Sequence, residues 1–259
     1  RKAGFKHTVS YAFGSRTGTC INAETGKATN KDVETGFKWK IPEELMDLIP
    51  ATTSGSGTIY VDTYHGATKI GTKYCGFTAT VPASVKPSCS FTLDDITGID
   101  DIYGSPVKGL SKIKVTVSAT LARSSPIASY SITADGVKYS GSTATTEALR
   151  TAGTSRVTAT VTDSRGRSGS ASYDMNVQNY SSPAITALSA QRCNSDGKIN
   201  RRGEYVKVTF SAAVSSMSSK NTAAYSLKYK KTAESESNYT PVAFPGLANN
   251  FAPANQTYI

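Results

Sequence analysis

Hydrophobic and polar residues alternate with a period of two along much of the chain. Residues 5–13 place aromatic and aliphatic side chains at the odd positions and mostly polar ones at the even positions. The same alternation returns at 112–121, 157–162, 173–177 and 205–210. It is typical of strands with one buried and one solvated face, as found in antiparallel sheets. The pattern therefore predicts an all-β fold built from antiparallel sheets.

Turn sequences separate these strands at short intervals. Residues 54–57 and 135–136 are two examples, rich in Gly, Ser and Asp, which suit tight hairpins. Many short strands joined by turns favour β-sandwiches. The one helix that the sequence predicts is short and spans 43–49, with Pro42 in the first helical position and Pro50 after its end.

Two similar junctions divide the chain. At each junction a strand runs into a short link that contains proline, and a new strand follows; the links are residues 83–88 and 178–183. Proline stiffens such a link and interrupts continuous sheet pairing. The recurrence at roughly ninety residues matches the size of an immunoglobulin-like β-sandwich. We predict tandem immunoglobulin-like modules at 1–87 and 88–182, and an incomplete third module at 183–259.

Charge adds little to this picture. The chain has 29 basic and 19 acidic residues, a net charge of +10, and the three predicted modules carry +4, +1 and +5. The basic residues are scattered, whereas a nucleic-acid module gathers them with aromatic side chains on one patch. Their densest cluster surrounds the turn-like residues 194–197 and consists of Arg192, Lys198, Arg201 and Arg202. We interpret it as a solvated loop, with contact to an anionic polymer such as teichoic acid or nucleic acid as the alternative.

Membrane insertion is not predicted, because no apolar run approaches the 18 or more residues of a membrane span. The sequence opens without an initiator Met or a signal segment and closes on what reads as the approach to another strand. We therefore expect it to be a piece of a longer polypeptide.

The four cysteines argue against a disulfide scaffold or a zinc site. Cys20, Cys75, Cys89 and Cys193 show no C-x-x-C spacing, and only the first predicted module holds a pair. Four free thiols are expected, in keeping with folding in a reducing cytoplasm. A bridge between Cys20 and Cys75 is the alternative.

Catalytic chemistry has few candidate centres. His7 lies mid-strand and His65 precedes a glycine at an expected hairpin tip, so both are interpreted as structural. No G-x-S-x-G, H-E-x-x-H or phosphate-binding glycine loop occurs. Distant carboxylates could still meet as a glycosidase pair, but no pair stands out. We predict that the chain is not an enzyme, and we assign no catalytic residue.

An acidic segment at 94–101 is the best metal candidate. Its four carboxylates surround one glycine, which suits the oxygen ligands of calcium, but their spacing does not match an EF-hand. We interpret it as an exposed acidic bulge, with an inter-module calcium ion as the alternative. We assign no metal and no cofactor.

Two further motifs have a structural and a functional interpretation. Tyr60, Tyr64 and Tyr74 are either core and edge-strand tyrosines or an aromatic platform for a sugar. In the string 163–169, Asp163 is expected to cap a hairpin turn while the two arginines, at positions 165 and 167, point into solvent.

Several strings resemble a known family. Residues 157–167 resemble the "vxDsrGr" hairpin of immunoglobulin-like domains in phage tail proteins. Strings at 7–15, 39–42, 49–50 and 54–57 are followed by strings at 61–64, 70–72, 81–82 and 86–88. Their order is similar to a family of siphophage minor structural proteins of uncharacterised function, found in phages and prophages of Gram-positive bacteria.

The resemblance implies a non-enzymatic virion protein of the tail or tail tip, synthesised in the host bacterial cytoplasm. Implied partners are other phage tail proteins and host cell-wall polysaccharide or teichoic acid, without nucleic acid or membrane insertion; homo-oligomerisation stays open. We expect residues 1–87, with their aromatics and long loops between Gly14 and Trp39, to carry the binding surface, and residues 88–182 to act as a spacer. The alternatives are a bacterial cell-surface adhesin or stalk and a carbohydrate-binding module of a glycan hydrolase.

Overall fold

The structure is a computed structural model that describes residues 4–33, 36–242 and 246–259. Almost all of its regular elements are strands, and they pair antiparallel, which confirms the predicted all-β class. The chain divides into two compact units. The first comprises residues 1–93, 115–144 and 157–173, and the second comprises 94–114, 145–156 and 174–259. The module boundaries predicted near residues 88 and 182 stay predictions.

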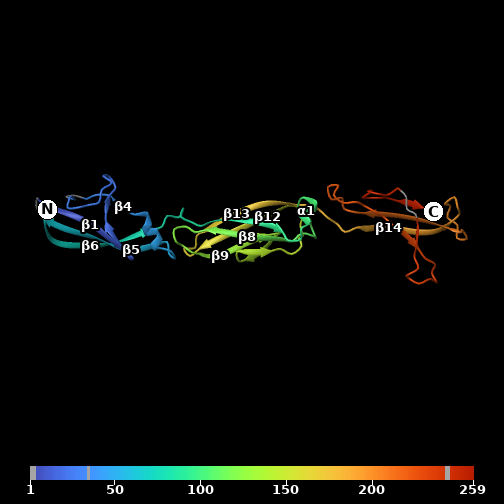
Figure 1. Cartoon of the computed structure of the whole chain (residues 1–259), viewed down its shortest axis with the longest axis horizontal. Coiled ribbons are helices and arrows are strands. Elements are labelled where there is room, and N and C mark those ends of the chain that lie inside the picture. Colours follow the sequence, from blue (N-terminus) through green and yellow to red (C-terminus); the bar gives the residue numbers. More distant parts are fainter. Residues whose placement is uncertain (1–3, 34–35, 243–245) are drawn as a thin grey trace. The chain divides into compact units, whose positions relative to one another are not determined.

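A four-stranded antiparallel sheet forms the N-terminal part of the first unit (Figure 1). Its order is β2-β1-β5-β6, made of β2 (Arg16–Thr19), β1 (Phe5–Phe13), β5 (Ser54–His65) and β6 (Thr68–Thr80). Val9 on β1 stands opposite Val61 on β5. The predicted alternation of β1 is confirmed, because its buried residues are odd-numbered.

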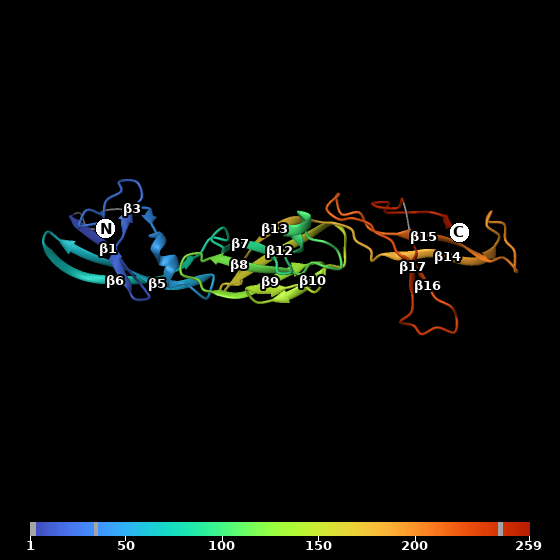
Figure 2. The ribbon, with the colours of Figure 1, turned by 45° about the vertical axis from the view of Figure 1, so that its right-hand side comes forward.

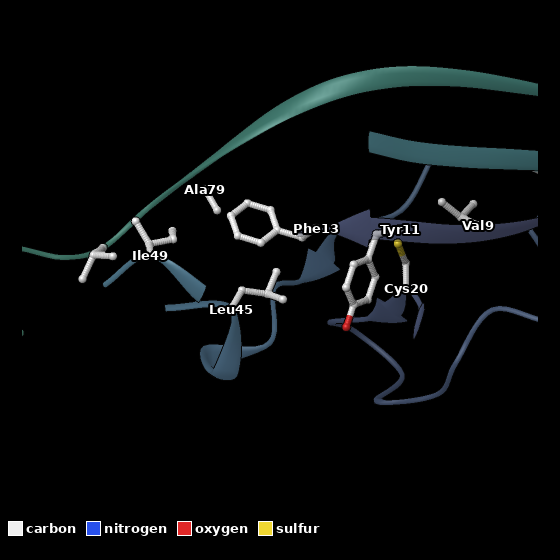
Figure 3. Close-up of a cluster of buried hydrophobic side chains, with 8 residues drawn as sticks. Val9, Tyr11, Phe13, Cys20, Leu45, Ile49 and Ala79 are labelled. Carbon is white, nitrogen blue, oxygen red and sulfur yellow. The ribbon is translucent and has the colours of Figure 1, made fainter. Parts of the chain in front are cut away.

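One face of this sheet is covered by the loop segment that follows β2 and by a short 3-10 helix, η1 (Glu43–Leu48). The covering segment also contains β3 (Ile21–Asn22) and β4 (Trp39–Lys40). The buried side chains between them come from both sides (Figure 3): Val9, Tyr11, Phe13, Cys20, Leu45, Ile49, Ala79 and Val81. The Trp39 ring lies 5.0 Å from that of Phe77 and 5.1 Å from that of Tyr11.

The predicted helix exists at the expected place, with one difference. Pro42 was predicted in the first helical position, but it is the N-cap, with an extended backbone (φ −62°, ψ 130°). A proline has no N–H to contribute to the first turn, so either position is compatible with helix initiation. The helix supplies one fully buried residue, Leu45, to the core.

The middle of the chain forms two further sheets (Figure 2). One has the order β10-β9-β12-β13 and consists of β10 (Val137–Ser140), β9 (Ile127–Ala134), β12 (Gly153–Asp163) and β13 (Ser168–Val177). The other has the order β11-β8-β7 and consists of β11 (Thr143–Thr145), β8 (Ile113–Thr120) and β7 (Ser88–Asp95). A five-residue helix, α1 (Ile99–Tyr103), follows β7.

The alternation predicted for these strands holds in their centres and fails at two places. Val157, Ala159 and Val161 are buried along β12, as expected. Leu121, expected to continue the buried face of β8, lies beyond the end of that strand and is 55% exposed. Tyr173, expected on the buried face of β13, is 57% exposed. Both errors arise because a strand's alternation does not reveal how far the opposing layer extends over it.

The C-terminal part has a three-stranded sheet in the order β14-β15-β18, made of β14 (Ala184–Cys193), β15 (Tyr205–Ala213) and β18 (Gln256–Tyr258). A small ribbon pairs β16 (Leu227–Tyr229) with β17 (Thr240–Val242). A modest core of Phe210, Ala212 and Leu247 forms here, with Tyr225 and Tyr258 against it. In the described part of the chain, no helix is long and apolar enough to span a membrane.

The four cysteines are free thiols, and Cys20 and Cys75 are not bridged. Cys20 is fully buried, whereas Cys75 is exposed on β6. Burial raises the pKa of the Cys20 thiol from 9.0 to about 11, because a thiolate is poorly solvated in an apolar core.

Cys75 is therefore expected to react with iodoacetamide in the native chain at about pH 8, while Cys20 stays unmodified until the chain unfolds. The pKa of Cys20 is higher in the folded state than in the unfolded state. The protonated thiol therefore stabilises the folded chain fully below pH 9.0, and this stabilisation is lost as the pH rises through about 11. Peptide mass spectrometry of pulse-labelled protein measures the first effect, and urea midpoints across this pH range, with Cys20→Ala as control, measure the second. Equal labelling of both thiols in the native chain would contradict the burial of Cys20.

Candidate functional site

The hairpin between β12 and β13 contains the predicted turn. The Asp163 Oδ1 atom accepts the backbone N–H groups of Arg165, at 3.0 Å, and Arg167, at 2.8 Å. Gly166 adopts a φ of +79°, a conformation that glycine reaches without steric cost. The predicted capping role of Asp163 is confirmed.

The predicted solvent exposure of Arg165 is wrong, because its side chain is completely buried. Its guanidinium donates hydrogen bonds to backbone carbonyls on two segments that are far apart in sequence. Nε bonds Ile49 O at 2.7 Å and Nη2 bonds Met46 O at 3.0 Å, both at the end of η1. Nη1 bonds Ala122 O and Nη2 also bonds Arg123 O, each at 2.7 Å, in the loop after β8. The five fixed donors of a guanidinium allow it to bond several carbonyls at once.

A buried carboxylate accompanies this buried cation. Asp163 Oδ2 lies 3.8 Å from Arg165 Nη1, and both side chains are fully buried. Burial lowers the pKa of the Arg165 guanidinium, and the nearby Asp163 charge opposes that shift. Arginine nevertheless keeps its charge in proteins. The hairpin therefore holds a charged group that depends on the four carbonyls and on Asp163 for compensation.

Arg167 was also predicted to point into solvent, and it too is directed to backbone. Its Nη1 atom bonds Val85 O at 2.9 Å and its Nη2 atom bonds Val81 O at 2.5 Å. The side chain is therefore held against the link that follows β6. A neighbouring hydrogen bond joins the same two segments. The Ser125 hydroxyl, two residues after Arg123, donates to the carbonyl oxygen of Pro50, the residue after Ile49, at 2.6 Å.

We call these contacts the arginine junction: Arg165 and Arg167, with the carbonyls of Met46, Ile49, Val81, Val85, Ala122 and Arg123. An exposed ion pair, Arg123 Nη2 to Glu43 Oε2 at 2.6 Å, lies at its periphery. The donors all bond main-chain oxygens of the same protein, so the arrangement is suited to holding segments together.

A second feature lies on the N-terminal sheet. Tyr60 on β5 and Tyr74 on β6 are cross-strand partners with ring centroids 6.3 Å apart. They are 36% and 76% exposed. Tyr64, the third tyrosine of the predicted platform, is partly buried, and the Lys31 Nζ atom lies 4.9 Å from its ring centroid. The structure therefore brings together two of the three tyrosines, and Lys31 covers the third.

Polar groups adjoin this tyrosine pair. The Asp62 carboxylate lies 2.8 Å from Lys69 Nζ and accepts a 2.6 Å hydrogen bond from Thr72 Oγ1. These hydrogen bonds from Lys69 and Thr72 lower the pKa of Asp62, so it is ionised at neutral pH. Asp62, Lys69 and Lys31 could not be predicted from the sequence, because the strand register places Asp62 and Lys69 on the face of the tyrosines and only the fold brings Lys31 to the Tyr64 ring.

The two histidines have structural contacts. His7 Nδ1 lies 3.0 Å from Thr63 Oγ1, and its backbone N–H donates to Val33 O. His65 ends β5 and pairs with Thr68 across the hairpin, as predicted. Its ring centroid lies 5.7 Å from that of Phe5.

The acidic segment differs from the predicted exposed bulge. Asp95 is buried, and its Oδ1 atom accepts hydrogen bonds from the Thr97 hydroxyl at 2.5 Å and from the Lys112 backbone N–H at 3.3 Å. Burial opposes ionisation of Asp95, but hydrogen bonds from Ser111, Thr97 and Lys112 prevail and lower its pKa. Burial and the neighbouring Asp95 and Asp101 charges raise the pKa of Asp100 on α1. Within residues 4–33, 36–242 and 246–259, no group of three or more His, Cys, Asp or Glu residues is placed to hold a metal ion.

The basic cluster at the C-terminal part is exposed, as interpreted from the sequence. Arg192, Lys198, Arg201 and Arg202 all lie at the surface around the 194–197 turn. Lys198 Nζ lies 3.7 Å from an Asp196 carboxylate oxygen.

Residues 1–243 match a protein family described as "Siphovirus protein of unknown function (DUF859)". The match covers most of the chain, including both arginines of the junction and all three tyrosines. No curated protein compared with the chain matches it.

Proposed function

The chain belongs to this family of siphovirus proteins, and from this premise we propose that it is a non-enzymatic structural protein of the phage tail or tail tip. In this role the chain either holds a host-binding surface at a distance or carries that surface itself. The siphovirus family supports a structural role in the phage, and it favours the virion over a bacterial adhesin or a hydrolase module.

The buried arginine junction is the observation that carries this proposal. A flexible tether needs no fixed contact between its elements, whereas a spacer must keep them in place under load. Arg165 ties the end of η1 to the loop after β8 through four carbonyl hydrogen bonds. Because breaking such a buried set leaves an uncompensated charge, the contact resists separation far more than surface ion pairs do.

The proposed architecture of the middle strands supports the same role. We propose that the sheets β10-β9-β12-β13 and β11-β8-β7 pack as an immunoglobulin-like sandwich, since four strands on three is the arrangement of the smaller immunoglobulin class. Such modules occur widely as structural repeats, and residues 88–182 would serve as the spacer.

The proposed partners are other tail proteins on one side and host cell-wall polysaccharide or teichoic acid on the other, without nucleic acid and without membrane insertion. Residues 1–87 would carry the host contact, because they hold the exposed pair Tyr60 and Tyr74. We propose no catalytic step: His7 and His65 are engaged in strand and hairpin contacts.

The location and the lack of catalysis are tested on purified virions and on the purified chain. Mass spectrometry is expected to find the peptides of this chain in virions at a fixed stoichiometry, and antibodies against it are expected to label the tail in electron micrographs. The purified chain is expected to release no reducing ends from host cell walls. Absence from virions, or label on the capsid, would contradict the proposal. Sugar release that a single carboxylate substitution abolishes would contradict the non-enzymatic part.

A further inference from the structure

The face of the N-terminal sheet opposite its core includes exposed residues of β5 and β6 and has an unusual composition. We define the tyrosine face as the even-numbered positions of β1 and β5 and their register partners on β6. Its central members are Thr8, Ser10, Thr58, Tyr60, Asp62, Tyr64, Thr72 and Tyr74. Among the residues paired in register on these strands, Ala12 is the one aliphatic member.

This composition does not fit the core of a protein–protein interface. Such cores combine aromatic side chains with other apolar groups and exclude charge. Here the two exposed rings, Tyr60 and Tyr74, are surrounded by hydroxyl groups and by the Asp62 carboxylate. Sugars present the same combination, because one face of the ring carries C–H groups that contact an aromatic ring while the edges carry hydroxyls that form hydrogen bonds.

The charge of the face narrows the class of sugar polymer. Lys69 is held by Asp62 at 2.8 Å, and Lys31 lies over the Tyr64 ring. Lys31 and Lys69 against the one carboxylate of Asp62 leave an excess of positive charge here, which attracts an anionic chain.

We propose that the tyrosine face is a binding site for an anionic glycan whose sugar units are joined through phosphodiesters. Tyr60 and Tyr74 contact the sugar rings, the Asp62 and Thr72 side chains bond hydroxyls, and Lys31 and Lys69 supply the charge that favours the phosphates. This inference rests on the proposed function and extends it. It assigns the surface that would contact the host and the class of host molecule that would bind there.

The experiment measures binding of the full chain to host cell walls in two forms: intact, and treated with hydrofluoric acid to remove phosphodiester-linked polymers. The native chain is expected to bind intact walls and to lose at least about tenfold in affinity for treated walls or at high salt, where charge attraction is screened. The double variant Tyr60→Ala/Tyr74→Ala is expected to lose at least about tenfold on intact walls, because truncating exposed aromatic contacts typically costs that much.

The matched control is Tyr173→Ala/Tyr229→Ala, which removes two tyrosines, each 57% exposed, that lie off this face. It is expected to bind as the native chain does. Tyr74→Ala alone, at a residue 76% exposed, is expected to leave the unfolding midpoint unchanged, and this midpoint is measured for each protein.

The outcomes separate the two proposals. Failure of the native chain to bind any wall preparation would contradict the host-binding part of the proposed function, and this site with it. Wall binding that the tyrosine substitutions leave unchanged would overturn the site while the proposed function stands. Equal affinity for treated and intact walls would overturn the anionic class of ligand.

Discussion

Replacing Arg165 with methionine is expected to lower the free energy of unfolding of the first unit by about 3–5 kcal/mol. The substitution leaves the carbonyls of Met46, Ile49, Ala122 and Arg123 without the guanidinium donors that they have in the native protein. It also leaves Asp163 as a buried carboxylate without its cation. Methionine fills a similar volume, so the loss measures hydrogen bonding and charge more than packing.

Urea unfolding followed by the fluorescence of Trp39, the single tryptophan, measures this effect, because Trp39 packs against the core of the N-terminal sheet. Arg201→Met, at an exposed arginine, is the matched control and is expected to change stability by less than about 0.5 kcal/mol. Arg165→Lys is expected to fall between them, since an ammonium keeps the charge but lacks the fork of donors. A shift for Arg165→Met no larger than that of the control would show that the junction does not stabilise the unit.

Replacing Gly169 with alanine is expected to destabilise the same unit by about 3 kcal/mol, near the upper end for overpacking. A Cβ added at Gly169 would lie 2.0 Å from Pro87 O and 2.9 Å from Pro87 C. Both are backbone atoms, so no side-chain rotation can relieve the contact, and β13 must move away from the link after β6.

Gly71→Ala is the matched control for this substitution. Gly71 lies on β6, and an added Cβ would meet nothing within 4 Å there. The same change of residue type is therefore expected to leave the urea midpoint nearly unchanged or to raise it slightly, because alanine restricts the unfolded chain more than glycine does. Equal effects of the two substitutions would indicate that the close approach of Gly169 to Pro87 is absent in solution.

Much of the secondary structure could be predicted from the sequence. The alternation in 5–13 correctly predicts β1 and its buried residues, because a period of two is a local property of a strand. Positions 135–136 adopt positive φ at both residues, as a tight hairpin turn with Asp and Gly requires. The helix at 43–49 was predicted from the prolines on either side of it, although its 3-10 form and the N-cap position of Pro42 were not predicted.

The functional features could be predicted only in part. The tyrosines were identified as candidates, but their pairing depends on the register of β5 with β6, which joins residues 14 apart in sequence. Asp95 was interpreted as exposed, and its hydrogen bond with the Lys112 backbone shows why a run of carboxylates does not reveal burial. Arg165 was assigned to solvent because the sequence of the hairpin does not show that carbonyls from distant segments surround its side chain.

The all-β class, the tight turn at 135–136 and the turn held by Asp163 follow from the sequence alone, because each depends on the conformational preferences of neighbouring residues. The turn predicted at 54–57 is wrong, because these residues begin β5 and pair with β6. The burial of Arg165 and the exposed pair of Tyr60 and Tyr74 on one face follow only from the three-dimensional fold. The partners of Arg165 are main-chain carbonyls, which every residue possesses and which therefore leave no mark in a sequence. They become a binding site for a guanidinium only when the fold brings the end of η1 and the loop after β8 to the same hairpin.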